Sequence, residues 1–469
     1  MYSPNKSLGK LGKLNYIQSY LSRVCLSDAP EGDDGTYGTQ SYPNTGDFPL
    51  NYEQIFPDLI DSKESGRTFN PAIQYHKGKL LTILRFNKMD KEIGSVYMKN
   101  KSYYVKNNTL IASVIEKSSK EPYIYHLGVL LDPFTDLLLG SRDIDRVPEL
   151  ETEVTEPSHY DCESTPDWLD GGHGPQDPRI FEFANNYYMI FNSRKQETHP
   201  NIKCPENSVQ RKIYISGLET DWMTGLITGW YRPISLNLKD EIDVPWKRNG
   251  DRIDTAERNW LPFTCESLNT SLNSSLKEML FMVYSLSPLI ILKVNLQTGD
   301  CFEYYRTEVD DFKLDPIRKD LISKGIPKID ISNMHISPHG GSPLVKVPNR
   351  NYLLGVLHIH YSSPTGHRIY VNYPFKFKNI EPFEILKIGK ALPLNSTVPE
   401  GYLNLSKSSG PRRFRDNYKI GSQISFVSDL TVWEEKDRIN VAISYGAGDA
   451  IPRIFFTSVE ELESEYFLE

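Results

Sequence analysis

Short apolar stretches rich in strand-forming residues recur along most of the chain, and they restrict its fold more than any other feature. Residues 79–86 (KLLTILRF) and 124–131 (IYHLGVLL) are examples, and such runs predict buried or half-buried strands. Residues 180–191 predict a complete hairpin, because Asn185 and Asn186 tolerate the left-handed backbone of a tight turn. Further stretches of this kind are residues 279–294, 352–361, 368–375 and 439–445.

Helix signals are scarce, and the short candidates are residues 315–324 and 458–466. An all-β segment of about 420 residues is too long for one ordinary sandwich and needs a repeated unit. A propeller of four-stranded blades meets this need. We therefore predict an all-β propeller over residues 51–469. Residues 1–50 are predicted to be an N-terminal lead-in or stem, because residues 27–47 are rich in Gly, Asp, Ser and Pro.

The composition argues against some partners and suits others. The chain of 469 residues has a formal net charge of −8, which argues against a nucleic-acid partner. No run of about 18 apolar residues occurs, so the sequence predicts no membrane span. The five Cys residues form no CxxC pair, so a zinc site is not expected. The aromatic content of 12% suits sugar binding, because aromatic faces stack on the C–H faces of pyranose rings.

Short polar motifs lie at the ends of predicted strands throughout the chain. The first is residues 69–72 (FNPA), before a strand that ends at Arg85, and the second is residues 174–180 (GPQDPRI), before the predicted hairpin. The third is residues 258–263 (RNWLPF). The last two are residues 340–343 (GGSP), before the strand with His358 and His360, and residues 444–449 (SYGAGD). In a propeller, the inner strands of all blades end around one central pocket. We therefore expect these distant motifs to converge there.

In this order the motifs resemble those of the family 130 glycoside phosphorylases and mannosidases, and of the β-mannosyltransferases related to them. That family has an FNP-then-Arg motif in its first blade, an EDPRI-type motif in its second and a YGAxD motif in its last. The resemblance covers about residues 67–455. It implies a five-bladed propeller that acts on mannose-type sugars.

Several features make the chain more similar to the fungal β-1,2-mannosyltransferases. Gln176 stands where the phosphorylases usually have Glu, a long acidic connection covers residues 143–173, and seven Asn-x-Ser/Thr sequons are present. The resemblance implies inverting transfer of mannose from GDP-mannose to a mannan or oligomannoside acceptor, with β-1,2 linkages in cell-wall glycans and no required cofactor. Those fungal proteins are Golgi type II membrane proteins. We therefore expect a Golgi lumenal location, with membrane attachment only through an anchor absent from this sequence.

Asp177 is the predicted catalytic carboxylate. In the resembling phosphorylases the matching Asp works through the sugar 3-hydroxyl as a proton relay, and in synthesis it would be the general base for the acceptor hydroxyl. The alternative is a turn cap before Pro178. Arg179 is expected either to pair with Asp177 or to bind substrate oxygens, and the alternative is a structural salt bridge. By the same resemblance, the residues that match mannose-binding positions are Asn70, Arg85 and Asp449, with Asn70 alternatively a turn residue.

Two further sets of side chains complete the predicted substrate site. Trp260 and Tyr445 are candidates for stacking on a sugar, or else they belong to the core. Asn259, from the same motif as Trp260, is a further candidate for substrate binding. A diphosphate leaving group needs cations, and the candidates are Arg258, His339, His358, His360, Arg412 and Arg413. His358 and His360 would also suit a metal, but no third ligand is evident, so no metal is predicted.

Three alternatives stay open at the level of sequence. A phosphorylase or mannosidase would use phosphate or water, and a mannosidase would need a second carboxylate, for which Glu182 and Glu257 are candidates. A metal-dependent transferase is suggested by Asp143-Ile144-Asp145, but the βαβ alternation of its nucleotide domain is absent. A non-catalytic carbohydrate-binding propeller is the third alternative, and the presence of Asp177 argues against it.

Overall fold

The computed structural model describes the part of the chain that carries the strands. All of these residues belong to one compact unit, Tyr42–Glu469. The described residues are 46–49, 66–76, 78–90, 105–116, 123–131, 176–194, 211–220, 227–231, 233–240, 242, 248–249, 252–253, 259–266, 278–307, 314–324, 338–362, 368–397, 423–448 and 451–467. No helix among them is long and apolar enough to cross a bilayer.

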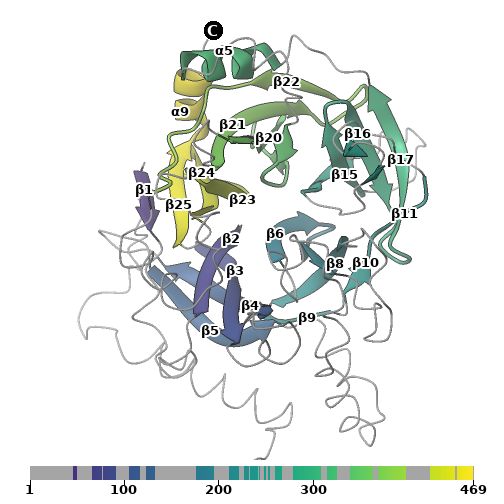
Figure 1. Ribbon diagram of the computed structural model, residues 1–469, viewed down its shortest axis with the longest axis vertical. Coiled ribbons are helices and arrows are strands. Elements are labelled where there is room, and N and C mark those ends of the chain that lie inside the picture. The colour runs from purple at the N-terminus through teal and green to yellow at the C-terminus, as the bar shows by residue number, and fades with distance from the viewer. Residues whose placement is uncertain are drawn as a thin grey trace, which may run out of the picture. The chain divides into compact units, whose positions relative to one another are not determined.

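The unit is built from antiparallel sheets of four or five strands, which stand around a common centre (Figure 1). The first sheet contains β2 (Gly66–His76), β3 (Lys79–Asp90), β4 (Val105–Glu116) and β5 (Tyr123–Leu131). The second contains β6 (Gln176–Phe183), β7 (Asn186–Arg194), β8 (Arg211–Thr220), β9 (Ile227–Trp230) and β10 (Ile234–Ser235).

Three more sheets follow in chain order. The third contains β14 (Leu261–Glu266), β15 (Glu278–Leu286), β16 (Leu289–Val294) and β17 (Asp300–Thr307), with β11 (Asn237–Leu238) added in parallel. The fourth contains β18 (His339–Gly340), β19 (Val345–Lys346), β20 (Leu353–Ser362), β21 (Arg368–Lys378) and β22 (Glu384–Ile388). The fifth contains β23 (Ser425–Glu435), β24 (Arg438–Ala447), β25 (Ile451–Ser458) and β1 (Gly46–Pro49).

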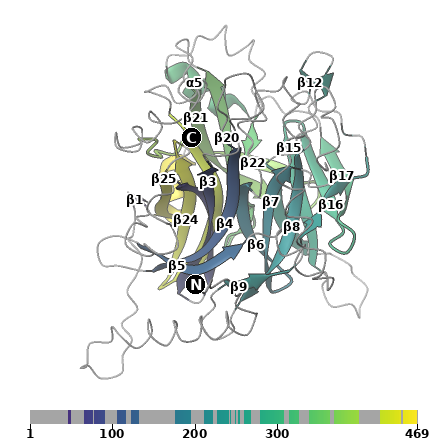
Figure 2. The same ribbon diagram turned by 60° about the horizontal axis from the view of Figure 1, so that its bottom comes forward.

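This arrangement confirms the prediction of an all-β, propeller-like fold. A separate two-stranded ribbon pairs β12 (Arg248–Asn249) with β13 (Arg252–Ile253). The strands β2, β6 and β23 face the centre, and β6 lies beside the first sheet in both views (Figures 1 and 2). The three sheets that carry these strands therefore bring their inner ends together, although the strands are far apart in the sequence.

The predicted hairpin at residues 180–191 is confirmed as the pair β6 and β7. Its two-residue turn is Ala184-Asn185, with φ of 48° and 59°, so both central residues are left-handed. Two left-handed residues are the mark of a type I′ turn, whose twist matches that of the flanking strands. The turn therefore keeps β6 and β7 in the register that puts Gln176 opposite Asn192.

Both predicted helical segments are also confirmed. The first is α5 (Asp315–Ser323), which has Pro316 near its start and buries Ile317 and Leu321. The second is α9 (Val459–Glu461), continued by the π-helical turn η5 (Leu462–Tyr466). A capping box begins α9, because Ser458 accepts from the Glu461 backbone and the Glu461 side chain accepts from the Ser458 backbone.

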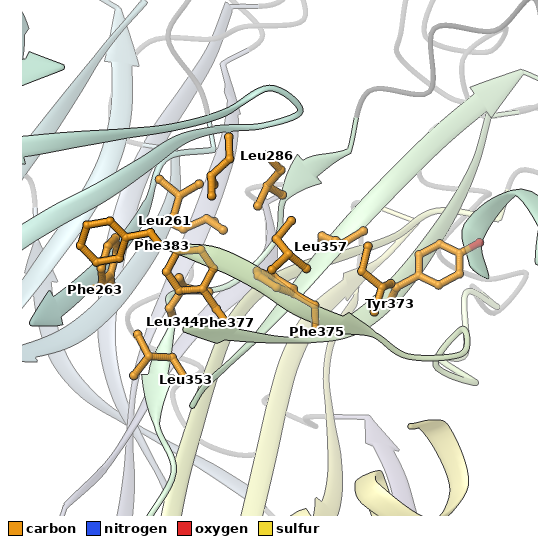
Figure 3. Close-up of a cluster of buried hydrophobic side chains, with 14 of the residues drawn as sticks. Leu261, Phe263, Leu286, Leu344, Leu353, Leu357, Tyr373, Phe375, Phe377 and Phe383 are labelled. Atoms are coloured by element: carbon orange, nitrogen blue, oxygen red, sulfur yellow. The ribbon is translucent and has the colours of Figure 1, made fainter. Parts of the chain in front are cut away.

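The hydrophobic core lies mainly between neighbouring sheets. One large cluster packs β14 and β15 of the third sheet against β20 and β21 of the fourth (Figure 3). Phe263 stacks on Phe281 at a centroid distance of 5.5 Å and meets the edges of Phe377 and Phe383. Each such fully buried aromatic side chain contributes about 1.5–3 kcal/mol by leaving water. Packing between the third and fourth sheets therefore fixes the distance between their strands.

The strand β1 completes the fifth sheet by pairing with β25, from Gly46 opposite Phe456 to Pro49 opposite Arg453. Asp47 on β1 accepts from Arg453 Nε at 3.0 Å and from the Tyr445 hydroxyl at 2.5 Å. The two ionic side chains are only 16% and 10% exposed. Sheet structure thus extends into the range predicted as the lead-in, and a nearly buried ion pair holds β1 in place.

Removing the Asp47 carboxylate is expected to destabilise the folded unit. Asp47→Ala leaves Arg453 nearly buried without its ionic partner, and we expect a loss of about 3 kcal/mol. The matched control is Lys239→Ala, which breaks the half-exposed Lys239–Asp300 pair and should cost less than about 1 kcal/mol. Urea unfolding, followed by tryptophan fluorescence, measures both variants. Equal midpoints for the two variants would contradict a clamping role for Asp47.

Candidate functional site

Asp177 lies at the start of β6 and is the centre of a polar cluster drawn from two sheets. Its Oδ1 accepts from Asn70 Nδ2 on β2 at 2.8 Å and from Arg85 NH1 on β3 at 2.8 Å. Its Oδ2 accepts from Asn192 Nδ2 on β7 at 3.3 Å. The Asp177 side chain is 17% exposed, and that of Arg85 is 9% exposed. The structure therefore brings together three residues that the sequence analysis placed at one substrate site.

The local backbone directs both Asn70 and Asp177 into this cluster. Asn70 has φ of 48° and Asp177 has φ of 51°, and each is followed by a proline. The ladder shifts register at both places, between Phe69 and Ala72 and between Gln176 and Arg179. Bulges re-aim side chains, and Asn and Asp are among the few non-glycine residues that tolerate positive φ. Such strained positions concentrate at functional sites.

The surroundings of Asp177 favour its ionised form. Burial alone would raise its pKa. The charge of Arg85, the hydrogen bond from Asn70, the charge of Arg179 and the hydrogen bond from Asn192 each lower the pKa. Together they hold the pKa of the Asp177 carboxyl below its ordinary value. At neutral pH the group is therefore a carboxylate that accepts hydrogen bonds only.

The two oxygens of Asp177 are not equivalent. Oδ1 accepts two short hydrogen bonds, whereas Oδ2 accepts one bond that is 0.5 Å longer than these. A carboxylate oxygen has room for about two donors, so Oδ2 keeps more accepting capacity than Oδ1. A hydroxyl of a bound ligand would therefore meet Oδ2 and leave the short bonds to Asn70 and Arg85 intact.

Arg179 ties the second sheet to its neighbours. Its Nε donates to the Gly341 carbonyl at 3.0 Å, and its NH2 donates to Asn259 Oδ1 at 3.3 Å. The side chain is buried, with 3% of the residue exposed. Its charge still lowers the pKa of Asp177. Of the roles that the sequence left open, these contacts favour the structural one, and Arg179 also acts electrostatically on Asp177.

The paired glycines of the 340–343 motif allow the contact between Arg179 and the Gly341 carbonyl. A Cβ on Gly340 would lie 2.2 Å from Leu261 Cδ2 and 2.5 Å from the Asn259 carbonyl oxygen, so only glycine lets β18 approach β14 this closely. This close approach carries the Gly341 carbonyl to Arg179. Asn259 itself has φ of 60°, which makes it the third left-handed polar residue of the site.

The three predicted histidines gather on the fourth sheet. His339 lies 5.6 Å from His358 and 5.2 Å from His360 between ring centroids, and Tyr370 and Phe426 extend the cluster. His358 is 2% exposed, and its Nδ1 has no hydrogen-bond partner. Burial, followed by the charges of His339, His360 and Arg179, lowers the pKa of His358 well below its ordinary value. His358 is therefore neutral at neutral pH.

The lowered pKa of His358 argues against the predicted cationic role for this residue, and for His339 and His360 that role stays a prediction. Within the described residues, no group of three His, Cys, Asp or Glu side chains is arranged to hold a metal ion. The rings face one another in stacked or tilted pairs, at interplanar angles of 28° and 31° for the pairs that involve His339.

The two candidate stacking rings lie in the core. Trp260 is 1% exposed and meets the edge of Tyr284 between the second and third sheets. Tyr445 is completely buried in the cluster shared by the fourth and fifth sheets, and its hydroxyl donates to Asp47. Both therefore follow the core alternative that the sequence left open, and neither ring presents a face to a sugar in this structure.

Several predicted residues lie outside the described part of the chain. These are Arg258, Arg412, Arg413 and Asp449, together with Glu257 and the acidic connection over residues 143–173. Conversely, the sequence analysis did not identify Asn192, which contacts Asp177 from β7. A polar side chain in the run YYMIFN, directly opposite Gln176 in the hairpin register, was the signal that pointed to it.

Comparisons with known proteins give structural neighbours only. No family model matches the chain, and no curated protein matches it. One solved neighbour is described as belonging to the GH130 family of mannoside phosphorylases, which contains hydrolases that target β-1,2-mannosidic linkages in Candida mannan. It is 12% identical with a TM-score of 0.43, and the match covers 92% of this chain and 96% of the neighbour.

Two further neighbours come from Leishmania mexicana. A mannose phosphorylase in complex with phosphate ion is 9% identical, and a GDP-Man-dependent mannosyltransferase is 8% identical. Each has a TM-score of 0.38, and each match covers 96% of this chain and 95% of the neighbour. The neighbours are thus carbohydrate-active proteins with mannose-related activities. At these identities and TM-scores, their activities are not transferred to this chain.

Removing the charge of Arg85 is expected to raise the pKa of Asp177. Arg85→Gln keeps donor atoms but loses the cation that stabilises the carboxylate, so Asp177 should hold its proton to higher pH. The titration is followed by carboxyl ¹³C chemical shifts in the labelled protein, with the signal assigned by its loss in Asp177→Asn. The control Arg306→Gln, in an exposed pair with Glu303, should leave the titration unchanged. An unshifted titration in Arg85→Gln would contradict the assigned electrostatics.

Proposed function

We propose that this protein is an inverting β-mannosyltransferase that moves mannose from GDP-mannose to a mannan or oligomannoside acceptor. The observation that carries the proposal is the state of Asp177: an ionised carboxylate, held at Oδ1 by Asn70 and Arg85 and with accepting capacity left at Oδ2. Such a group is suited to take a proton from an attacking hydroxyl. The motif resemblance supports mannose as the sugar and β-1,2 as the linkage.

The proposed architecture is a five-bladed propeller in which the five larger sheets are the blades. The motifs with Asn70, Asp177, Asn259 and Gly340 lie at or before the innermost strands of the first four sheets, as the family resemblance would require. Seven sequons and the similarity to fungal proteins support a lumenal, Golgi location for the reaction. The number of blades and the Golgi location are both parts of the proposal.

The proposed reaction is a single displacement at the anomeric carbon. The acceptor hydroxyl gives its proton to Asp177 Oδ2, directly or through the sugar 3-hydroxyl, while its oxygen bonds to C1 of mannose. The bond from C1 to the diphosphate oxygen breaks, and GDP leaves with the bonding electron pair. Because attack and departure occur on opposite faces, the α-linked donor gives a β-linked product through an oxocarbenium-like transition state.

The leaving diphosphate needs positive charge or hydrogen-bond donors nearby. His339 and His360 are proposed for this role, because their cluster acts electrostatically on the same His358 as Arg179 does. Arg258, Arg412 and Arg413 remain proposed contacts from outside the described residues. No metal ion or other cofactor is part of the proposed reaction.

A β-mannoside phosphorylase is the second candidate. The same histidines could hold inorganic phosphate as the attacking group, and Asp177 would then have to pass a proton to the leaving sugar oxygen, directly or through the sugar 3-hydroxyl. A mannosidase fits less well among the described residues. Glu182 lies five residues along β6 from Asp177, about 16 Å at strand spacing, whereas an inverting pair is about 6.5–9.5 Å apart. Asp429, another acid that contacts this region among the described residues, is completely buried.

The first functional experiment incubates the purified chain with GDP-mannose and a labelled oligomannoside. We expect a β-mannosyl product from the native chain, and a rate reduced by about 10²–10⁴-fold in Asp177→Asn, since the base is lost while the shape is kept. Asp437→Asn, in the exposed turn between β23 and β24, is the matched control and should keep full activity.

Other products would redirect the assignment. Release of mannose 1-phosphate from a β-mannoside in the presence of phosphate, with no product from GDP-mannose, would identify a phosphorylase. Release of free mannose would identify a mannosidase. Oligomannoside binding without turnover under either condition would identify a carbohydrate-binding propeller, and the transferase proposal would then be wrong.

A further inference from the structure

The strands β2 and β6 carry the same local arrangement around the candidate site. In each, a left-handed polar residue is followed by proline, and an isoleucine stands three positions after the polar residue: Asn70 with Ile73, and Asp177 with Ile180. Both strands are the innermost strands of their sheets. On that side, their backbone N–H groups face another sheet rather than a neighbouring strand of the ladder.

One carboxylate receives both isoleucine N–H groups. Asp429 Oδ2, on β23, accepts from Ile73 N at 3.0 Å and from Ile180 N at 2.7 Å. Asp429 Oδ1 accepts from Leu430 N at 2.8 Å. Asp429 is completely buried, so no water replaces these bonds. A single oxygen atom thus connects the first, second and fifth sheets, three positions beyond the two residues that form the candidate site.

Other side chains of the fifth sheet hold β2 alone. Ser428 Oγ and Ser444 Oγ both donate to the Pro71 carbonyl, at 2.6 and 2.5 Å, and Thr431 Oγ1 accepts from Tyr75 N at 3.1 Å. These contacts secure the bulge that carries Asn70, but they do not reach β6. Asp429 differs from them because it contacts both strands and therefore sets the distance between them.

We propose that Asp429 is a positioning residue that holds Asn70 and Asp177 at hydrogen-bond distance. It acts through the backbone of β2 and β6 and does not touch a ligand. The Asn70–Asp177 bond is 2.8 Å long, and a displacement of about 1 Å between the two strands would break it. The same displacement would move Asp177 away from Arg85, which follows β2 on β3. The consequence for turnover rests on the proposed transferase function, whereas the consequence for Asp177 itself does not.

The test compares two isosteric substitutions on the same face of β23. Burial raises the pKa of Asp429 well above its ordinary value, so the test depends on its oxygen acceptors and not on its charge. Asp429→Asn turns an N–H₂ group toward either Leu430 N–H or the isoleucine N–H groups, so donors oppose donors. Thr431→Val is the matched control, because it removes the acceptor of Tyr75 N, two residues along the strand, and touches β2 only. Both variants leave buried backbone groups unpaired, so both are expected to lower the unfolding midpoint.

The decisive readout is the titration of Asp177, followed by its carboxyl ¹³C shift in the absence of any substrate. In Asp429→Asn we expect a higher Asp177 pKa, because the donors from Asn70 and Arg85 are displaced from a mostly buried carboxylate. In Thr431→Val the titration should equal that of the native chain. With GDP-mannose and acceptor, kcat should fall about 10–100-fold in Asp429→Asn with little change in KM, since misplacement of about 1 Å costs that much.

Each outcome separates the two proposals. An unshifted Asp177 titration in a folded Asp429→Asn variant would overturn the positioning role, whatever the activity shows. Equal shifts in both variants would also overturn it, because a general loss of stability would then explain them. A shifted titration in Asp429→Asn alone, in a protein that transfers no mannose, would support the positioning role and refute the proposed function.

Discussion

The ion pair between Arg85 and Asp177 is the interaction on which the candidate site depends. A carboxyl group that is only 17% exposed would tend to keep its proton, and a neutral acid cannot accept one from a hydroxyl. Arg85 supplies a charge at 2.8 Å, on the neighbouring sheet rather than on the strand of Asp177. The spacing of the first two sheets therefore decides the chemical state of Asp177, and inter-sheet contacts become part of the chemistry.

Local signals carried the correct predictions, because they depend on a few adjacent residues. The hairpin at 180–191 follows from turn chemistry, and the helix at 315–324 has a proline near its start. The grouping of Asn70, Arg85 and Asp177 follows from the order of the motifs. Trp260 and Tyr445 could not be placed in this way, since burial depends on which sheet packs over the ring. Asn192 contacts Asp177 from the neighbouring strand of the same sheet, and Asp429 contacts two other sheets through one oxygen atom. No periodic pattern in the sequence marks such contacts.

The polar groups of the site are unusual in how deeply they are held. Arg179 and His358 are each at most 3% exposed. Arg179 nevertheless carries a charge, and His358 has an Nδ1 atom without a hydrogen-bond partner. Apolar residues would fill the same volume at lower electrostatic cost. Buried polar networks of this kind specify one arrangement of the chain, because a slipped sheet would leave several donors without acceptors at once. The buried polar groups therefore lower the stability of the fold relative to an apolar core, while they fix the position of Asp177.

The pairing of β1 with β25 also has a consequence for synthesis. A ribosome makes β1 some 400 residues before its partner β25. While the residues between β1 and β25 are made, β1 therefore has no partner, and β2 and β6 precede the Asp429 that accepts from their N–H groups. The emerging chain can assemble individual sheets, but the contacts that join the first, second and fifth sheets form only after β23 has been made. A product that ends before β23 would lack the Asp429 contacts to β2 and β6.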